Sequence, residues 1–176
     1  MRTVRTALRS ERRRLAILSR QTHAPSKHGA CFILETMINN SLFTSKSNEW
    51  ETPKEFFDQL NQEFNFTLDP CASIENHKCA NYFTKCDDGL KQEWCGHTVF
   101  CNPPYGKELP LWVQKCYEQH NKYGITIVLL IPARTDTKYF HKYIYGKSEI
   151  RFIQGRLKFS NSKQSAPFPS MVVVYR

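Results

Sequence analysis

The sequence lacks any apolar run that approaches the ~20 residues of a membrane-spanning helix, and its first residues lack the apolar core of a secretory signal. It also lacks a C-x-x-C pair, and its seven cysteines are an odd number. These absences argue against a membrane protein and against a secreted fold held by disulfides. We therefore expect a soluble, cytoplasmic protein with reduced thiols.

The cysteines also lack a standard zinc-binding spacing. Cys71, His77, Cys79 and Cys86 lie close together in the chain, but the intervals between them match no common ligand pattern. Small buried packing residues are the better interpretation of these cysteines. We therefore expect no metal.

Acidic residues are scarce at the start of the chain. Residues 1–30 hold eight Lys and Arg against one acid, Glu11, and contribute +7 to the net charge of +9. Such a segment suits a sequence-independent attraction to phosphates or a flexible leader. We expect residues 1–48 to form a basic, flexible leader and connector, and residues 49–176 to form one compact domain.

The rest of the chain alternates between strand and helix patterns. Apolar and β-branched runs predict strands at residues 66–69, 98–101, 125–131, 150–159 and 171–175. Apolar residues at helical spacing predict helices at residues 53–64, 109–120 and 135–145, with a short one at 76–82. Thr52 suits the N-cap of the first helix, and Pro53 suits its first turn. This order predicts an α/β fold whose mostly parallel sheet ends in an antiparallel strand pair.

Asn102, Pro103, Pro104 and Tyr105 directly follow the strand expected at 98–101. Two prolines cannot continue a sheet ladder, so the backbone leaves the sheet in a stiff turn at the edge where open α/β folds bind ligands. The Asn102 and Pro103 carbonyl groups offer acceptors for the two hydrogens of an exocyclic amine. Tyr105 offers a face for stacking a base. The turn therefore predicts a methyltransferase that modifies the amino group of a planar heterocycle.

Several further motifs occur in a fixed order around this turn. They are Trp-Glu-Thr-Pro at 50–53, Leu-Asp-Pro-Cys-Ala at 68–72, Asp-Asp-Gly-Leu at 87–90, Cys-Asn-Pro-Pro-Tyr-Gly at 101–106, Leu-Ile-Pro-Ala-Arg-Thr-Asp-Thr at 130–137 and Gly-Arg-Leu-Lys-Phe at 155–159. In content and order they resemble the phage-type (Dam-like) DNA N6-adenine methyltransferases, over roughly residues 50–175. The chain also has no glycine from 30 to 88. That absence fits this family but argues against a typical dinucleotide-binding enzyme.

The resemblance implies a Rossmann-like domain that uses S-adenosylmethionine as methyl donor. It implies a catalytic turn made of Asn102, Pro103, Pro104 and Tyr105. It implies a donor site made of Thr52, Pro53, Asp69, Ala72, Asp88 and Asn102. Helix capping explains Thr52 and Pro53 equally well, and a solvated turn is the alternative for Asp88.

The resemblance also implies double-stranded DNA as the partner, in a bacterial or phage-infected host cell. Tyr105 would stack on a flipped adenine, and Arg134, Arg156 and Lys158 would contact DNA. The turn alone leaves other acceptors open: cytosine N4, RNA adenine or a protein glutamine. A basic DNA-binding module without catalytic activity is a further alternative. The wider match favours adenine N6 in DNA.

Overall fold

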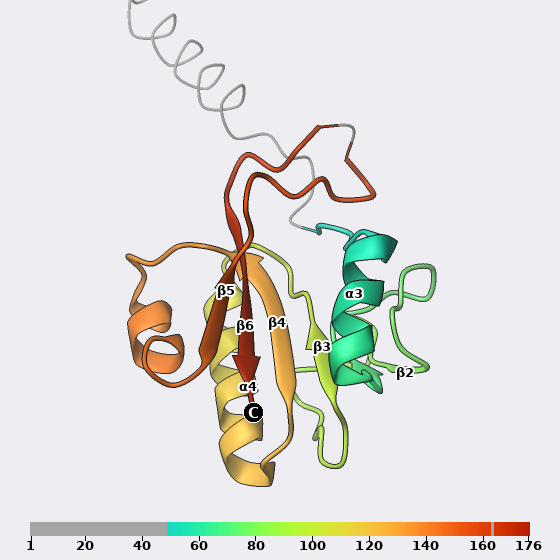
Figure 1. Cartoon of the computed structure of the whole chain (residues 1–176). Coiled ribbons are helices and arrows are strands. Elements are labelled where there is room, and N and C mark those ends of the chain that lie inside the picture. Colours follow the sequence, from blue (N-terminus) through green and yellow to red (C-terminus); the bar gives the residue numbers. More distant parts are fainter. Residues whose placement is uncertain (1–48, 163) are drawn as a thin grey trace, which may run out of the picture. The chain divides into compact units, whose positions relative to one another are not determined.

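The computed structural model describes residues 49–162 and 164–176 (Figure 1). The leader and connector expected at residues 1–48 lie outside the described residues. None of the described helices is long and apolar enough to cross a membrane.

One mixed sheet forms the centre of the described domain. Its strands are β1 (Leu68–Asp69), β2 (Asn81–Tyr82), β3 (Val99–Cys101), β4 (Ile127–Pro132), β5 (Glu149–Phe152) and β6 (Ser170–Tyr175). Across the sheet their order is β2-β1-β3-β4-β6-β5. The first four are parallel to one another, whereas β6 runs antiparallel to both β4 and β5. The sheet is thus mostly parallel with an antiparallel C-terminal pair, as the sequence predicts.

Helices cover both faces of this sheet. They are α3 (Lys54–Phe64), α4 (Leu109–Tyr123) and the short π-helix η1 (Phe140–Ile144). Alternate side chains of β4 point to opposite faces: Leu129 packs in the same cluster as Trp112 of α4, and Leu130 packs with Phe57 of α3. η1 packs with α4, so α3 lies on the other face (Figure 1).

The chain changes direction within the sheet at β1 and β3. From β1 it continues outward to β2, whereas from β3 it crosses through α4 to β4 on the other side. In parallel α/β sheets, such a divergence leaves a crevice at the carboxyl ends of the two strands. Asp69 is the last residue of β1, and Asn102 directly follows β3. The topology therefore brings these two predicted site residues to the same place.

Several expected elements differ from the structure. The helix expected at 76–82 is wrong: this segment is a loop that ends in β2, because Asn81 and Tyr82 pair with β1. The helix expected at 135–145 is reduced largely to η1. The strand expected at 150–159 ends at Phe152, and the chain turns at Gly155 with φ +77°.

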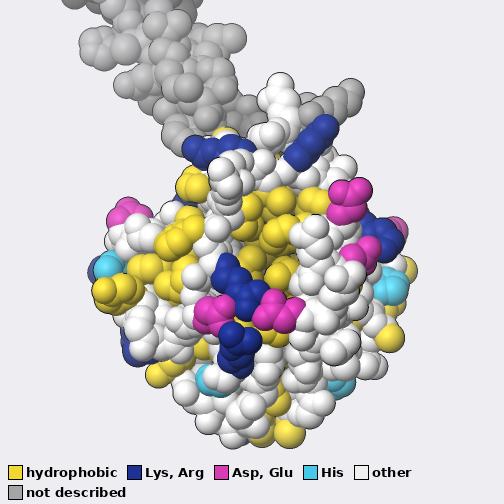
Figure 2. Space-filling view, in the orientation of Figure 1, with side chains coloured by type: hydrophobic (Ala, Val, Ile, Leu, Met, Phe, Trp, Pro, Cys, Tyr) yellow, Lys and Arg dark blue, Asp and Glu magenta, His cyan; other side chains and the backbone are white. Residues whose placement is uncertain are grey.

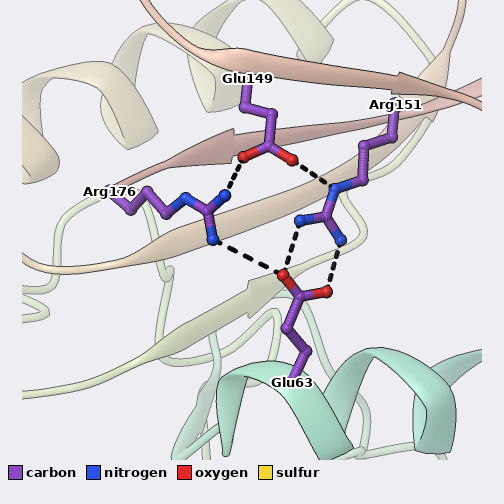
Figure 3. Close-up of polar contacts among 4 residues, drawn as sticks. All are labelled: Glu63, Glu149, Arg151 and Arg176. Carbon is purple, nitrogen blue, oxygen red and sulfur yellow. Dashed lines mark hydrogen bonds and ion pairs between the residues drawn. The ribbon is translucent and has the colours of Figure 1, made fainter.

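Four charged residues link α3 to the edge strand β5 (Figure 3). Arg151 donates to both carboxylate oxygens of Glu63, at 2.5 and 2.6 Å, and its Nε donates to Glu149 at 2.6 Å. Arg176 pairs with both carboxylates and closes the ring.

On the face of the molecule seen in Figure 1, hydrophobic side chains gather in a hollow beside a group of charged side chains (Figure 2).

Candidate active site

The predicted turn leaves the sheet at the carboxyl end of β3. The three residues of β3 are fully buried, Pro103 is buried, and the flanking Asn102 and Tyr105 are half-buried. A stiff turn at the end of a buried strand holds its side chains against a rigid support. The turn therefore fixes the position of the Asn102 amide relative to the sheet.

The Asn102 amide is held by the segment that precedes α3. Its Nδ2 donates to the Trp50 carbonyl oxygen at 2.5 Å and to Thr52 Oγ1 at 2.9 Å. A carbonyl oxygen can only accept, so the NH₂ end of the amide must face Trp50. The Oδ1 end therefore faces the other way. Thr52 is 1% exposed.

This contact replaces the helix cap expected for Thr52. α3 begins at Lys54, Pro53 is the residue before it, and no side chain caps the helix. The prediction of Thr52 as N-cap and of Pro53 in the first turn is therefore wrong. Pro53 contributes its carbonyl oxygen, which accepts from the Phe57 N–H at 3.0 Å.

The Tyr105 hydroxyl group lies at the Oδ1 end of Asn102. It is 2.8 Å from Asn102 Oδ1 and 3.0 Å from the Leu130 carbonyl oxygen on β4. Burial raises the pKa of the Tyr105 phenol well above its usual range, so the hydroxyl keeps its proton and donates. It has one hydrogen for two acceptors, and a second lone pair of Oδ1 stays free for another donor.

The Tyr105 ring belongs to an aromatic cluster above the sheet. Phe168 and Phe159 meet it at steep angles of 75° and 77°, with ring centroids 5.5 and 6.1 Å away. Trp50 contacts the same two phenylalanines, at 5.2 and 5.1 Å. Both phenylalanines come from the segment between β5 and β6. This segment therefore packs against Tyr105 of the 102–105 turn.

Asp69 is a buried carboxylate at the end of β1, 4% exposed. Its two oxygens accept the backbone N–H groups of Cys71 and Lys78, at 3.2 and 3.1 Å. Burial raises the pKa of the Asp69 carboxyl group to about 6, although both hydrogen bonds favour its charged form. The carboxylate thus organises the loop after β1 and places negative charge at the carboxyl end of that strand.

The loops after β1 and β2 pack closely together. The Ala72 N–H donates to the Phe83 carbonyl oxygen at 3.0 Å. A Cβ atom built on Gly89 would lie 2.2 Å from the Pro70 carbonyl oxygen, so only glycine permits this approach. Asp88, which precedes Gly89, has a φ of +53° and pairs with Lys91 at 2.8 Å. The structure thus brings the 87–89 turn beside the Asp69–Ala72 segment.

The three basic residues predicted to contact DNA are exposed. Arg134 follows the carboxyl end of β4, whereas Arg156 and Lys158 lie between β5 and β6. A backbone hydrogen bond attaches this last segment to the residues before α3, since the Ser160 N–H donates to the Glu51 carbonyl oxygen at 2.9 Å. Arg156 and Lys158 are therefore carried by a segment that also packs against Tyr105.

Sequence reasoning missed the groups that orient the turn. Trp50 and Leu130 act through backbone carbonyl oxygens, which no side-chain pattern reveals. Phe159 and Phe168 are aromatic residues on either side of the last loop, and their apolar character in a polar segment was the available signal. All four lie far from Asn102 in the sequence.

The cysteines in the described part of the chain divide into packed and exposed groups. Cys79, Cys101 and Cys116 are buried, and Cys71 Sγ lies 3.5 Å from Cys101 Sγ. Burial raises the pKa of the Cys71 and Cys116 thiols, which therefore stay protonated. Cys86 and Cys95 are exposed, so the packing interpretation is wrong for Cys86. Within residues 49–162 and 164–176, no group of three or more His, Cys, Asp or Glu side chains is arranged to hold a metal ion.

Comparisons with known proteins agree with the motif order. Residues 39–176 match the family described as DNA N-6-adenine-methyltransferase (Dam). The DNA N-6-adenine-methyltransferase of Haemophilus phage HP1 (strain HP1c1) is 34% identical over 125 residues, which cover 68% of this chain and 72% of the phage protein. YfdM of Escherichia coli (strain K12), whose description as a methyltransferase is itself provisional, is 35% identical over 65 residues, or 33% of this chain and 71% of YfdM. The chain therefore belongs to the Dam family of DNA N-6-adenine-methyltransferases.

Proposed function

We propose that the 102–105 turn is the catalytic centre at which this enzyme transfers a methyl group from S-adenosylmethionine to adenine N6 in double-stranded DNA. The observation that carries the proposal is the forced orientation of the Asn102 amide. Its NH₂ end is held by Trp50 and Thr52, so Oδ1 is left as an acceptor beside Tyr105. An exocyclic amine needs such an acceptor.

The strand order supports a Rossmann-like domain with the methyl donor across the strand ends. The divergence between β1 and β3 creates the kind of crevice in which α/β folds bind nucleotides. Asp69 is the last residue of β1, and Asn102 directly follows β3, which supports a donor site at these two strand ends. The donor would therefore lie between the end of β1 and the catalytic turn.

The residues at this crevice fit S-adenosylmethionine chemically. The buried Asp69 carboxylate suits the cationic ammonium group of the donor, and the small Ala72 side chain permits close approach to the backbone. Asp88 lies in the adjoining turn and is assigned to the adenosine end of the donor. Thr52, Pro53 and Asn102 complete the site at the amino-acid end.

The chemistry requires the target adenine to leave the DNA stack, because N6 must align with the methyl carbon. When bound, S-adenosylmethionine supplies an electrophilic methyl group on a sulfonium sulfur. Asn102 Oδ1 and the Pro103 carbonyl oxygen would accept the two amine hydrogens and direct the N6 lone pair toward that carbon. N6 would gain the methyl group as the carbon–sulfur bond breaks, the bonding electron pair would stay on sulfur in the S-adenosylhomocysteine product, and N6 would then release one proton to water. Positioning supplies much of the rate.

Tyr105, Pro104 and the exposed basic residues complete the DNA side of the proposal. Pro104 keeps the turn stiff, so that the Tyr105 ring stays near Asn102 and stacks on the flipped adenine. Arg134, Arg156 and Lys158 would contact phosphates, which position the duplex without reading its sequence. The setting proposed for this reaction is the cytoplasm of a bacterial or phage-infected cell, and the phage relative supports it.

Methylation of plasmid DNA by the purified full-length chain tests the proposal. With saturating S-adenosylmethionine we expect N6-methyladenine by modification-detecting sequencing, and none with Asn102→Ala. Lys122→Ala is the matched control, since Lys122 is an exposed residue at the opposite end of α4. Methylation of cytosine N4, or full activity in Asn102→Ala, would overturn the assignment. RNA and glutamine-containing peptides test the remaining acceptors.

A further inference from the structure

Both amide hydrogens of Asn102 are committed in the structure. One points to the Trp50 carbonyl oxygen at 2.5 Å and the other to Thr52 Oγ1 at 2.9 Å. An asparagine amide has only these two hydrogens, and the Trp50 carbonyl oxygen, which can only accept, specifies which end of the amide is nitrogen. The consequence is an Oδ1 atom that faces Tyr105.

The two acceptors differ in whether a side-chain substitution can remove them. The Trp50 carbonyl group belongs to the backbone, and no side-chain substitution removes it. Thr52 contributes a side-chain hydroxyl, and because the residue as a whole is only 1% exposed, this group is shielded from competing water. It reaches Asn102 across 50 residues of sequence, from the extended segment before α3. The Thr52 hydroxyl is therefore the one of these two acceptors that a side-chain substitution can remove.

We propose that Thr52 is a positioning residue, which holds the Asn102 amide in its reactive orientation and so sets the rate of methyl transfer. The proposal rests on the proposed function of Asn102, and it gives Thr52 a role beyond lining the donor site. Without the Thr52 acceptor, one buried N–H of Asn102 loses its partner, and the amide is held only by its bond to the Trp50 carbonyl oxygen and can tilt about that bond. A tilted amide would carry Oδ1 away from the position proposed for the amine of the target adenine.

If Thr52 positions Asn102, its substitution should lower kcat for methyl transfer more than it weakens donor binding. Thr52→Val keeps the shape and removes the acceptor, so we expect kcat at saturating donor and DNA to fall by about 10- to 100-fold, as misplacement of a reacting group does. The Kd for S-adenosylhomocysteine, measured by calorimetry, is expected to rise by no more than about tenfold, the effect of losing one net hydrogen bond, because Thr52 also lines the proposed donor site. Thr52→Ser keeps the hydroxyl, and we expect it to restore kcat to within about threefold on the same basis.

Three outcomes would overturn the proposal. One is an unchanged kcat in Thr52→Val, and another is a weakened Kd with unchanged kcat at saturation, which would make Thr52 a donor-binding residue alone. The third is a Thr52→Ser variant that folds normally and is as slow as Thr52→Val. Failure of the proposed function is recognised by a different result: Asn102→Ala would then retain full activity, independently of the Thr52 variants.

A measurement on the unsubstituted protein keeps the proposal testable if Thr52→Val does not fold. In ¹⁵N-asparagine-labelled protein, the Asn102 carboxamide signals are those missing from Asn102→Ala. We expect both of its protons downfield of free asparagine and slow to exchange, because both are bonded and sheltered. In Thr52→Ser this pattern should persist. Carboxamide shifts of Asn102 equal to those of free asparagine would overturn the proposal.

Discussion

The Tyr105 hydroxyl group donates a hydrogen bond to Asn102 Oδ1 at 2.8 Å, within reach of a second acceptor, the Leu130 carbonyl oxygen at 3.0 Å. In the free enzyme Tyr105 thus shares the atom that the target amine is proposed to use. When the amine arrives, the hydroxyl hydrogen can turn to Leu130. Asn102 Oδ1, the proposed acceptor, would therefore be hydrogen-bonded in both situations.

Substitutions of Tyr105 should distinguish the contribution of its ring to activity from that of its hydroxyl group. Tyr105→Phe loses one net hydrogen bond of ~0.5–1.5 kcal/mol, so we expect kcat/KM for DNA to stay within about tenfold. Tyr105→Ala also loses stacking of ~1–3 kcal/mol per base, so we expect a loss of about 10- to 100-fold or more. Steady-state kinetics on one DNA substrate measures both. Equal losses in the two variants would contradict a stacking role.

Donor binding should weaken in acid. The pKa of Asp69 is raised by burial to about 6, so the carboxyl group is charged above that pH and protonated below it. A protonated Asp69 cannot attract the ammonium group of S-adenosylhomocysteine. Calorimetry from pH 8 to pH 5 should show a Kd that rises by about tenfold in total, mainly below pH 6. Asp69→Asn should bind weakly with a flat profile, and a parallel profile in that variant would contradict the assignment.

The Asp69 carboxyl group should affect the stability of the fold in the opposite direction: rising pH is expected to strengthen donor binding but to lower the free energy of unfolding. Its pKa is higher in the folded protein than the ordinary value of 3.8, so between these values the folded state binds more protons than the unfolded state. The contribution of Asp69 to the free energy of unfolding therefore decreases as the pH rises from about 4 to about 6. Urea unfolding at several pH values, compared with Asp69→Asn, measures it. A variant with the same pH dependence as the native protein would contradict the raised pKa.

Gly89→Ala should disturb the donor side of the crevice. The new Cβ would lie 2.2 Å from the Pro70 carbonyl oxygen, and the backbone there cannot move as a side-chain tip does. We expect a loss of ~1–3 kcal/mol in the free energy of unfolding and a weaker Kd for S-adenosylhomocysteine. Gly96→Ala is the control: it has open space but a φ of +78°, so it carries backbone strain without crowding. If both variants bind the product equally, crowding at Pro70 is not responsible.

Exposed basic residues should control the salt dependence of DNA binding. If Arg156 and Lys158 each contact a phosphate, removal of either should reduce the slope of log K against log salt by ~1. Fluorescence titrations between low and moderate salt measure the slope. Lys122→Ala, at the far end of α4, should leave the slope unchanged. A slope unaffected by Arg156→Ala would exclude a phosphate contact there.

The ring of Figure 3 should contribute to stability at neutral pH. Arg151 lies between Glu63 and Glu149 and holds the pKa of both carboxyl groups below their usual range. Arg151→Met would leave two like charges close together, so we expect Tm to fall by a few degrees at low salt. The ion pairs stabilise the folded protein only while the carboxyl groups are charged. The difference in Tm between the native protein and Arg151→Met should therefore decrease as the pH falls through the lowered pKa values. A difference that persists in acid would contradict an electrostatic origin.

The sequence predicted the large elements well and the loop geometry poorly. The apolar run at 125–131 identifies β4, since a strand buried on both faces must be apolar throughout. The helix expected at 76–82 failed because tertiary pairing of Asn81 and Tyr82 with β1 outweighs local pattern. The cap expected at Thr52 failed for a similar reason, since Asn102 takes the hydroxyl.

By itself the sequence determined the class of chemistry: a stiff Asn-Pro-Pro-Tyr turn after a buried strand, with its companion motifs in family order. Only the tertiary structure decided which way the Asn102 amide points. That direction depends on the Trp50 carbonyl oxygen and the Thr52 hydroxyl, which come from a segment about fifty positions earlier. A backbone carbonyl group is common to every residue, so only folding determines which one meets Asn102.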